Sequence, residues 1–137
     1  MNYLNYVNIK QGSKSVKRFS NGNTLPLVQL PFGFASFSVQ TDSSRGCWYY
    51  NPEEKFFEGV RITRQPSPWI GDHGAIVFTP QSENAKKDFD EIWSGYDELE
   101  AKPHYLKLYA KRPECTIELT PTMYGAKVRL NFETDFD

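Results

Sequence analysis

Polar and apolar residues alternate strictly along three segments in the second half of the chain. In residues 105–111, tyrosine and lysine alternate with leucine and alanine, and residues 115–122 and 126–133 repeat this alternation. A period of two residues places successive side chains on opposite faces of a β-strand. The pattern therefore predicts three strands with one aliphatic face on a core. The residues expected to point inward are Leu106, Leu108, Ala110, Ile117, Leu119, Val128, Leu130 and Phe132.

The turn "PTMYGA" between the last two segments predicts a hairpin connection, in which Gly125 is available for a positive φ. In the first half, shorter runs of β-branched and aromatic residues are cut by Gly, Pro, Asn and Ser, which predicts short strands. These runs are residues 25–30, 34–40, 47–50, 59–64 and 75–80.

Residues 82–101 are the exception, because they are acidic and lack β-branched runs. They predict a polar excursion with room for a turn of helix, and Ser94-Gly95 argues against one long helix. The remaining pattern predicts an all-β fold, an antiparallel β-sandwich, because many short strands need two sheets to bury their aromatic residues. Residues 1–137 are expected to form a single domain or a partial domain. A last strand without a closing turn would expose a sheet edge, so we expect a truncated part of a larger protein.

Composition narrows the classes of function. Sixteen basic residues face seventeen acidic ones, so the positive charge expected of a nucleic-acid-binding protein is missing. Cys47 and Cys115 match no metal-binding spacing and are expected to be free thiols. The N-terminal residues lack the pattern of a signal peptide, and no run has the length of a membrane span. These features predict a soluble cytoplasmic protein without nucleic-acid or membrane partners.

Two tryptophans stand at places suited to ligand contact. Trp48 lies in "GCWYY", and Trp69 lies in "PSPWIGDHG", where prolines and glycines crowd before a predicted strand. An indole at a loop end can stack on a ligand while its N–H stays free to bond, but it can equally pack into the core. Both interpretations stay open for each tryptophan.

Candidate catalytic groups are few. No nucleophile motif occurs, and His73, between Asp72 and Gly74, cannot complete a zinc site with Asp72 alone. The carboxylates of "NPEEKFFEG" lie near Phe56 and Phe57 in sequence, a combination found in glycosidases, but a surface loop explains the same residues. No residue of the chain is therefore predicted to be catalytic or to bind a metal.

The order of these motifs resembles the N-terminal domain of family 92 glycoside hydrolases, the calcium-dependent exo-acting α-mannosidases. The family's Pro-Phe-Gly segment is matched by Pro31, Phe32 and Gly33. Its Asp-x-Gly element and the following apolar strand are matched from Asp72 to Pro80. Two later strands are matched at Pro103 and Tyr105 and at Glu118 to Thr122. Where many members read His-Thr-His-Leu-Ser-Gly, this chain reads "ITRQPS" and lacks those histidines, and a divergent subgroup with a different leaving-sugar preference is one explanation.

The resemblance implies a part of a longer α-1,2-mannosidase. Its catalytic carboxyl groups and calcium are expected in a separate (α/α) barrel domain, which is the implied partner of this chain. The implied ligand is a mannose-containing glycan, with Trp48, Trp69, Asp72 and His73 as substrate-binding residues. Alone, the chain is expected to be inactive and open to self-association. The alternative is a stand-alone β-sandwich that binds carbohydrate or protein.

Overall fold

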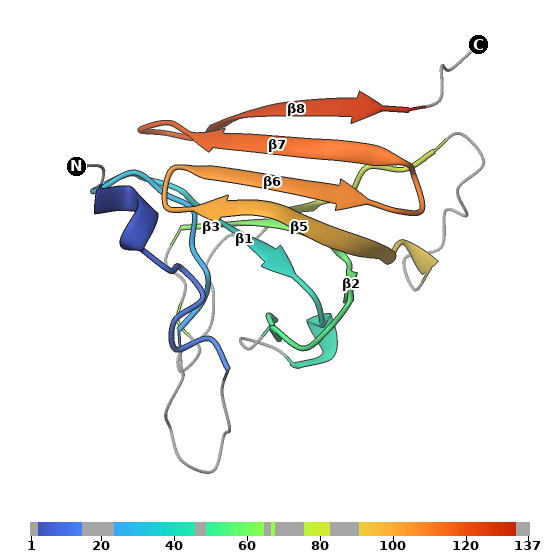
Figure 1. Cartoon of the computed structure of the whole chain (residues 1–137), viewed down its shortest axis with the longest axis horizontal. Helices are drawn as coiled ribbons and strands as arrows, with labels where there is room; N and C mark the ends of the chain where they lie inside the picture. Colours follow the sequence, from blue (N-terminus) through green and yellow to red (C-terminus); the bar gives the residue numbers. More distant parts are fainter. Residues whose placement is uncertain are drawn as a thin grey trace.

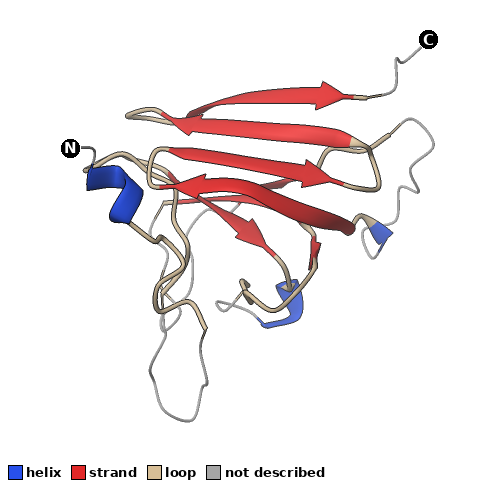
Figure 2. Cartoon of the chain, in the orientation of Figure 1, coloured by secondary structure: helices blue, strands red, loops and turns tan. Residues whose placement is uncertain are grey.

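The computed structural model describes residues 3–14, 24–45, 49–64, 67, 76–82 and 91–133. Within them the secondary structure consists of β-strands and short 3-10 helices (Figure 1, Figure 2). The helical turns are η1 (Tyr3–Tyr6) and η3 (Ser43–Arg45). The strands are β1 (Ser36–Gln40), β2 (Phe56–Phe57), β3 (Gly59–Thr63), β4 (Ile76–Phe78), β5 (Ser94–Lys102), β6 (Tyr105–Ala110), β7 (Cys115–Pro121) and β8 (Ala126–Phe132). In the part described, no helix is long and apolar enough to cross a membrane.

The strands form two antiparallel sheets. The smaller sheet has the order β1-β3-β4, and the larger one has the order β2-β5-β6-β7-β8. Figure 1 shows β5 to β8 as successive neighbours, with β1 and β3 behind them. The predicted all-β sandwich is confirmed.

One core lies between the sheets, and the alternation predicted the part of it that β6 and β7 supply. Leu106, Leu108 and Ala110 are buried on the inner face of β6, and Ile117 and Leu119 lie beside them on β7. The smaller sheet supplies the opposing residues Phe37, Val39 and Val60. Apolar side chains of both sheets thus cover each other, which stabilises the fold by removing their surfaces from water.

Strand β8 departs from the predicted burial. Val128 and Leu130 pair with Leu119 and Ile117, so they lie on the same inner face of the sheet. They nevertheless remain 44% and 41% exposed. The prediction of the inward direction holds, but the expectation of a buried strand is wrong at these two residues.

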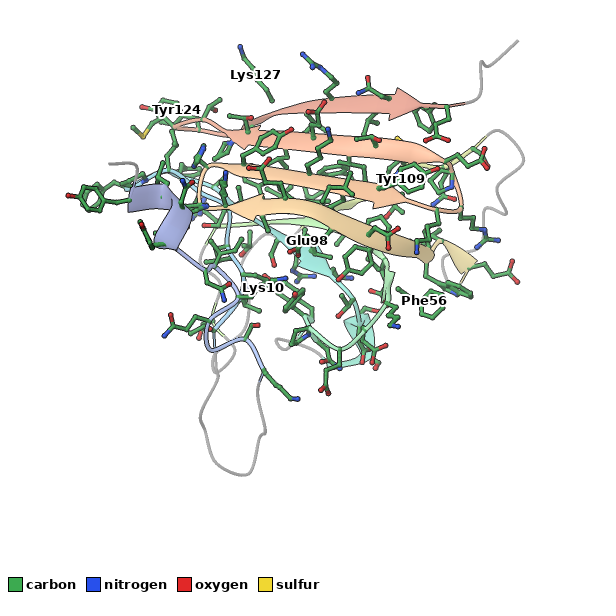
Figure 3. The ribbon with its side chains drawn as sticks, viewed as in Figure 1. Lys10, Phe56, Glu98, Tyr109, Tyr124 and Lys127 are labelled. Carbon is green, nitrogen blue, oxygen red and sulfur yellow. The ribbon has the colours of Figure 1, made fainter. Side chains whose placement is uncertain are left out.

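The polar segment 82–101 contains a strand that the sequence pattern did not predict. β5 has nine residues and pairs with β6, and a bulge between Glu98 and Glu100 shifts its register. Tyr96 and Glu98 face the core, but the next inward residue is Ala101, because the bulge adds one position. Glu98 also points inward, where the ammonium of Lys10 binds its carboxylate at 2.7 Å (Figure 3). The sequence pattern does not reveal this strand, because the bulge breaks the period of two and because the acidic Glu98 takes a position that faces the core.

Two expectations for connecting segments are also wrong. Residues 25–30 form no strand, and only Val28 makes a bridge, with Phe37. Pro26 and Pro31 lack the N–H that a strand needs to pair with a neighbour. Gly125 does not adopt a positive φ, since the glycines that do so among the described residues are Gly12 and Gly59. The hairpin closes instead through two hydrogen bonds. The N–H of Thr122 donates to the carbonyl of Gly125, and the N–H of Gly125 donates to the hydroxyl of Thr122.

Candidate functional site

Exposed aromatic residues gather at the end of the sandwich where the connection between β3 and β4 begins. We call this group the rim, which consists of Phe32, Phe34, Arg64, Met123 and Tyr124 and lines a pocket of about 580 Å³. Arg64 directly follows β3, whereas Met123 and Tyr124 form the turn between β7 and β8. Figure 3 shows Tyr124 at this end of the larger sheet. Large apolar side chains exposed together on a surface are typical of a binding site.

Phe32 has the least favourable backbone of the rim. Its φ is +59°, and its side chain is fully exposed. A bulky residue in the left-handed region is an outlier that costs roughly 1–3 kcal/mol. No burial of the ring offsets this cost. Strained residues of this kind cluster at active sites and ligand clamps, which makes Phe32 a candidate contact residue.

Hydrogen bonds hold the segment that carries Phe32. The N–H of Gln29 donates to the carbonyl of Pro103 at 2.8 Å, in the turn between β5 and β6. The N–H of Phe34 donates to the carbonyl of Met123 at 2.7 Å. The guanidinium of Arg64 lies 5.0 Å from the centre of the Phe34 ring, within the range of a cation–π interaction. The rim is therefore attached to two turns of the larger sheet.

The four residues predicted to bind substrate lie outside the described residues. Trp69, Asp72 and His73 belong to the connection that leaves β3 at Arg64 and returns at Ile76. Ile76 pairs with Ile62, so both ends of this connection start from the end of the sheet that carries the rim. The structure thus places the anchors of the predicted loop beside the rim, and the roles of the three residues stay predictions.

Trp48 also lies outside the described residues, but its neighbours are clear. Tyr49 and Tyr50 are buried, and the guanidinium of Arg61 lies 4.4 Å from the centre of the Tyr49 ring. Burial raises the pKa of Tyr50, and the nearby Tyr96 and Glu98 raise it further. The two tyrosines that follow Trp48 are therefore packing residues, and the role of Trp48 itself stays a prediction.

The carboxylates of "NPEEKFFEG" have structural partners. Glu58 accepts bonds from Gln40 at 2.6 Å and from the N–H of Ser43 at 3.0 Å. Glu53 pairs with Lys14, and Glu54 accepts a bond from Asn51 at 3.3 Å. These contacts fix a surface loop, which favours the structural interpretation over proton transfer. Across the residues that the structure describes, no group of three His, Cys, Asp or Glu side chains could hold a metal ion.

The residue pattern points to the tryptophans and does not reveal the rim as a site. Pro31, Phe32 and Gly33 carried part of the family resemblance, but nothing in their pattern indicated that the Phe32 ring is exposed. Tyr124 lies in the predicted turn "PTMYGA", where its pattern indicates a connection and not a site. The signal that could have found them is a large aromatic residue inside each of two predicted turns, where the core cannot bury it.

Comparisons with known proteins identify the family. The sequence profile of the glycosyl hydrolase family 92 N-terminal domain matches residues 6–136. The structure is similar to the family GH92 inverting mannosidase BT2199 from Bacteroides thetaiotaomicron, with 28% identity and a TM-score of 0.83 over 97% of this chain and 18% of that one. It also resembles the α-mannosidase BT3965 from the same organism, solved with mannoimidazole, with 23% identity and a TM-score of 0.77 over 96% of this chain and 18% of that one. No curated protein sequence matches significantly. The chain thus spans less than a fifth of these solved chains, and it belongs to glycosyl hydrolase family 92, whose N-terminal domain it matches over nearly its whole length.

Proposed function

We propose that this chain is part of the N-terminal sandwich of an α-1,2-mannosidase and that its rim borders the sugar-binding pocket. The catalytic groups would lie on a separate (α/α) barrel packed against the rim end of the sandwich. The observation that carries this proposal is Phe32, an exposed aromatic residue with a strained backbone, next to the anchors of the loop that bears Trp69. Membership of family 92 supplies the class of substrate.

The chemistry of the rim suits binding and not bond cleavage. Inversion at a sugar carbon needs two carboxyl groups ~6.5–9.5 Å apart with a water between them. The rim consists of Phe32, Phe34, Arg64, Met123 and Tyr124, which offer aromatic surface and guanidinium donors but no carboxylate. These groups can orient a sugar ring, and proton transfer is left to the catalytic domain. Calcium, too, is assigned to that domain in this proposal, as the family resemblance implies.

The first test is an assay of the chain alone. Purified residues 1–137, supplied with calcium and an α-1,2-linked mannobiose, should release no mannose, because both proton-transfer groups lie elsewhere. Turnover that persists through stringent purification, and that follows the protein through a further column, would overturn the proposal.

The second test uses the longer protein that contains this chain. Trp69→Ala should lower kcat/KM roughly 10- to 100-fold, equivalent to about 1–3 kcal/mol, with little change in Tm. Tyr109→Ala on the outer face of β6 is a matched control that removes an aromatic ring away from the rim and should leave kcat/KM unchanged. If Trp69 is a core residue, Trp69→Ala should instead cost about 3–5 kcal/mol of folding stability with nearly normal kinetics.

The alternative function is a stand-alone module in which the rim is a complete binding platform. A module of this kind would bind mannosides with the isolated chain, and Phe34→Ala and Tyr124→Ala would weaken that binding. In the proposed function, the isolated rim is one side of a pocket and binds a mannoside far more weakly than the longer protein does. Titration calorimetry on both proteins separates the two functions.

A further inference from the structure

A second aromatic pocket lies at the other end of the larger sheet. It has a volume of about 540 Å³ and is lined by Phe56, Glu91, Trp93, Ser94, Gly95, Lys111 and Arg112. Figure 3 shows Phe56 and Tyr124 at opposite ends of the molecule, so this pocket is separate from the rim. Its volume falls in the range of small-molecule sites. A protein partner would instead bury a broad surface of at least several hundred Å² on each side.

A glycine forms the floor of this pocket. Phe56 pairs with Gly95 across β2 and β5, and the N–H of Lys111 donates to the carbonyl of Gly95 at 2.8 Å. Phe56 and Lys111 therefore flank a strand position that has no side chain. A Cβ built on Gly95 would meet the Cδ of Lys111 at 3.3 Å, and the φ of Gly95 is not in the left-handed region. The backbone does not require glycine here, but the aliphatic part of the Lys111 side chain lies over this position, so a larger residue would push it toward the pocket.

Two exposed rings form one wall. Phe56 is 51% exposed and Trp93 is 47% exposed. Their ring centres lie 5.1 Å apart with an interplanar angle of 82°, the edge-to-face geometry that aromatic pairs favour. Each ring restrains the other, so the apolar wall is formed before any ligand arrives. Such preorganisation lowers the entropy cost of binding.

Arg112 is also held in position beside this wall. Its guanidinium donates to the carbonyls of Glu91 and Trp93, and it lies 5.8 Å from the centre of the Trp93 ring. The N–H of Arg112 donates to the hydroxyl of Ser94 at 2.9 Å. A guanidinium has five N–H donors, so the two carbonyls leave capacity for a ligand.

The pocket carries charges of both signs, because its lining includes Lys111 and Arg112 as well as Glu91. The ammonium of Lys111 is already paired with Asp97 at 2.9 Å. An aromatic wall beside hydrogen-bond donors suits a molecule that has one apolar face and several hydroxyl groups.

We propose that this pocket binds a hexopyranose ring. The C–H face of the sugar would cover Trp93 and Phe56, and its hydroxyl oxygens would accept hydrogen bonds from Arg112 and Lys111. The proposal rests on the proposed function only for the class of ligand, because the two sites share no residue. A second sugar site away from the rim would hold a branched glycan at two points, which raises the effective concentration of its other branch at the rim.

The test is a titration of the ¹⁵N-labelled chain with methyl α-mannopyranoside, followed by NMR. Saturable shifts are expected for the backbone amides of Gly95 and Lys111 and for the indole N–H of Trp93, with a roughly millimolar Kd. Glycerol, a polyol without a ring face, should give no saturable shifts. Shifts confined to Phe34, Arg64 and Tyr124, or no saturable shifts at all, would overturn the proposal without affecting the proposed function.

A blocking variant sharpens the test. Gly95→Val places a branched side chain in the floor and should weaken binding at least about tenfold while retaining Tm, because valine suits a strand position. Thr116→Val adds a valine to the outer face of β7, away from the pocket, and should bind like the unmodified chain. Equal binding by both variants would overturn the proposal. Tyr124→Ala should leave this binding unchanged.

Discussion

Strands β7 and β8 carry the same alternation and are neighbours in one sheet, yet their inner faces differ. Ile117 and Leu119 on β7 are fully buried, whereas their direct partners Leu130 and Val128 on β8 are about two-fifths exposed. A groove of about 380 Å³ separates the start of β8 from the smaller sheet. The difference arises because three strands cover only part of a sheet of five. Alternation therefore predicts the face of a side chain but not whether that face is covered.

The largest loss of stability is expected at a residue of the larger sheet that the smaller sheet covers completely. Ile117→Ala removes atoms that both sheets enclose, so it should cost about 2–5 kcal/mol of unfolding free energy through lost transfer energy and a residual cavity. Leu130→Ala is the matched control on the paired strand and should cost about 1 kcal/mol or less. Urea denaturation of the three proteins measures both values. Equal losses would show that β8 is as well covered in solution as β7.

The distinction between regular and irregular pairing also decides which elements the residue pattern predicts. Periodicity predicted β6, β7 and β8 because their pairing is regular and their inner residues are aliphatic. It missed β5, where a bulge and the inward Glu98 break the pattern. It also missed the rim, because the φ of Phe32 and the exposure of Tyr124 depend on neighbouring turns that are distant in sequence. Local patterns predict strands, whereas sites assembled from several turns need tertiary contacts.

The second prediction concerns the smaller sheet, which covers the inner face of the larger one. Gly59 begins β3 with a φ of +155°, and a Cβ there would clash with the hydroxyl of Thr79 and lie 2.6 Å from the carbonyl of Phe78. Gly59→Ala should therefore push β4 away from β3 and cost roughly 1–3 kcal/mol. Gly125→Ala is the control, since nothing lies within 4 Å of its Cβ position. Thermal unfolding should show a clear drop in Tm for the first variant only. A similar Tm for both would contradict the close approach of β4.

The third prediction concerns the exposed face of β8. We expect the isolated chain to self-associate through Val128 and Leu130, because contiguous exposed apolar surface drives association. Leu130→Lys should weaken this association at little cost in stability. Sedimentation velocity over a range of concentrations measures it, and Lys127→Ala on the other face of β8 is the control. A monomer at all concentrations before any substitution would contradict the prediction.

The smallest effect is expected on the outer face of the same sheet, which is polar. The hydroxyl of Tyr105 donates to the carboxylate of Glu118, which raises the pKa of Tyr105 to about 12 and lowers the pKa of Glu118. Because a raised pKa favours the protonated tyrosine in the folded state, its contribution is present below the ordinary value of 10 and is lost as the pH rises through 12. Tyr105→Phe should make the alkaline loss of stability shallower across this window. Part of the alkaline loss of stability should remain in this variant, because burial also raises the pKa of Tyr96 to about 12.

On the acid side, the lowered pKa of Glu118 means that its contribution is present above the unfolded-state value and is lost as the pH falls through the folded-state value. Tyr105→Phe should return the pKa of Glu118 toward its ordinary value, since it removes the first cause of the shift. NMR titration of the Glu118 carboxyl and urea denaturation at several pH values measure the two effects. Because both side chains are only partly buried at the surface of the sheet, the changes should be much smaller than that of Ile117→Ala. Identical pH profiles for the two proteins would show that this hydrogen bond does not persist in solution.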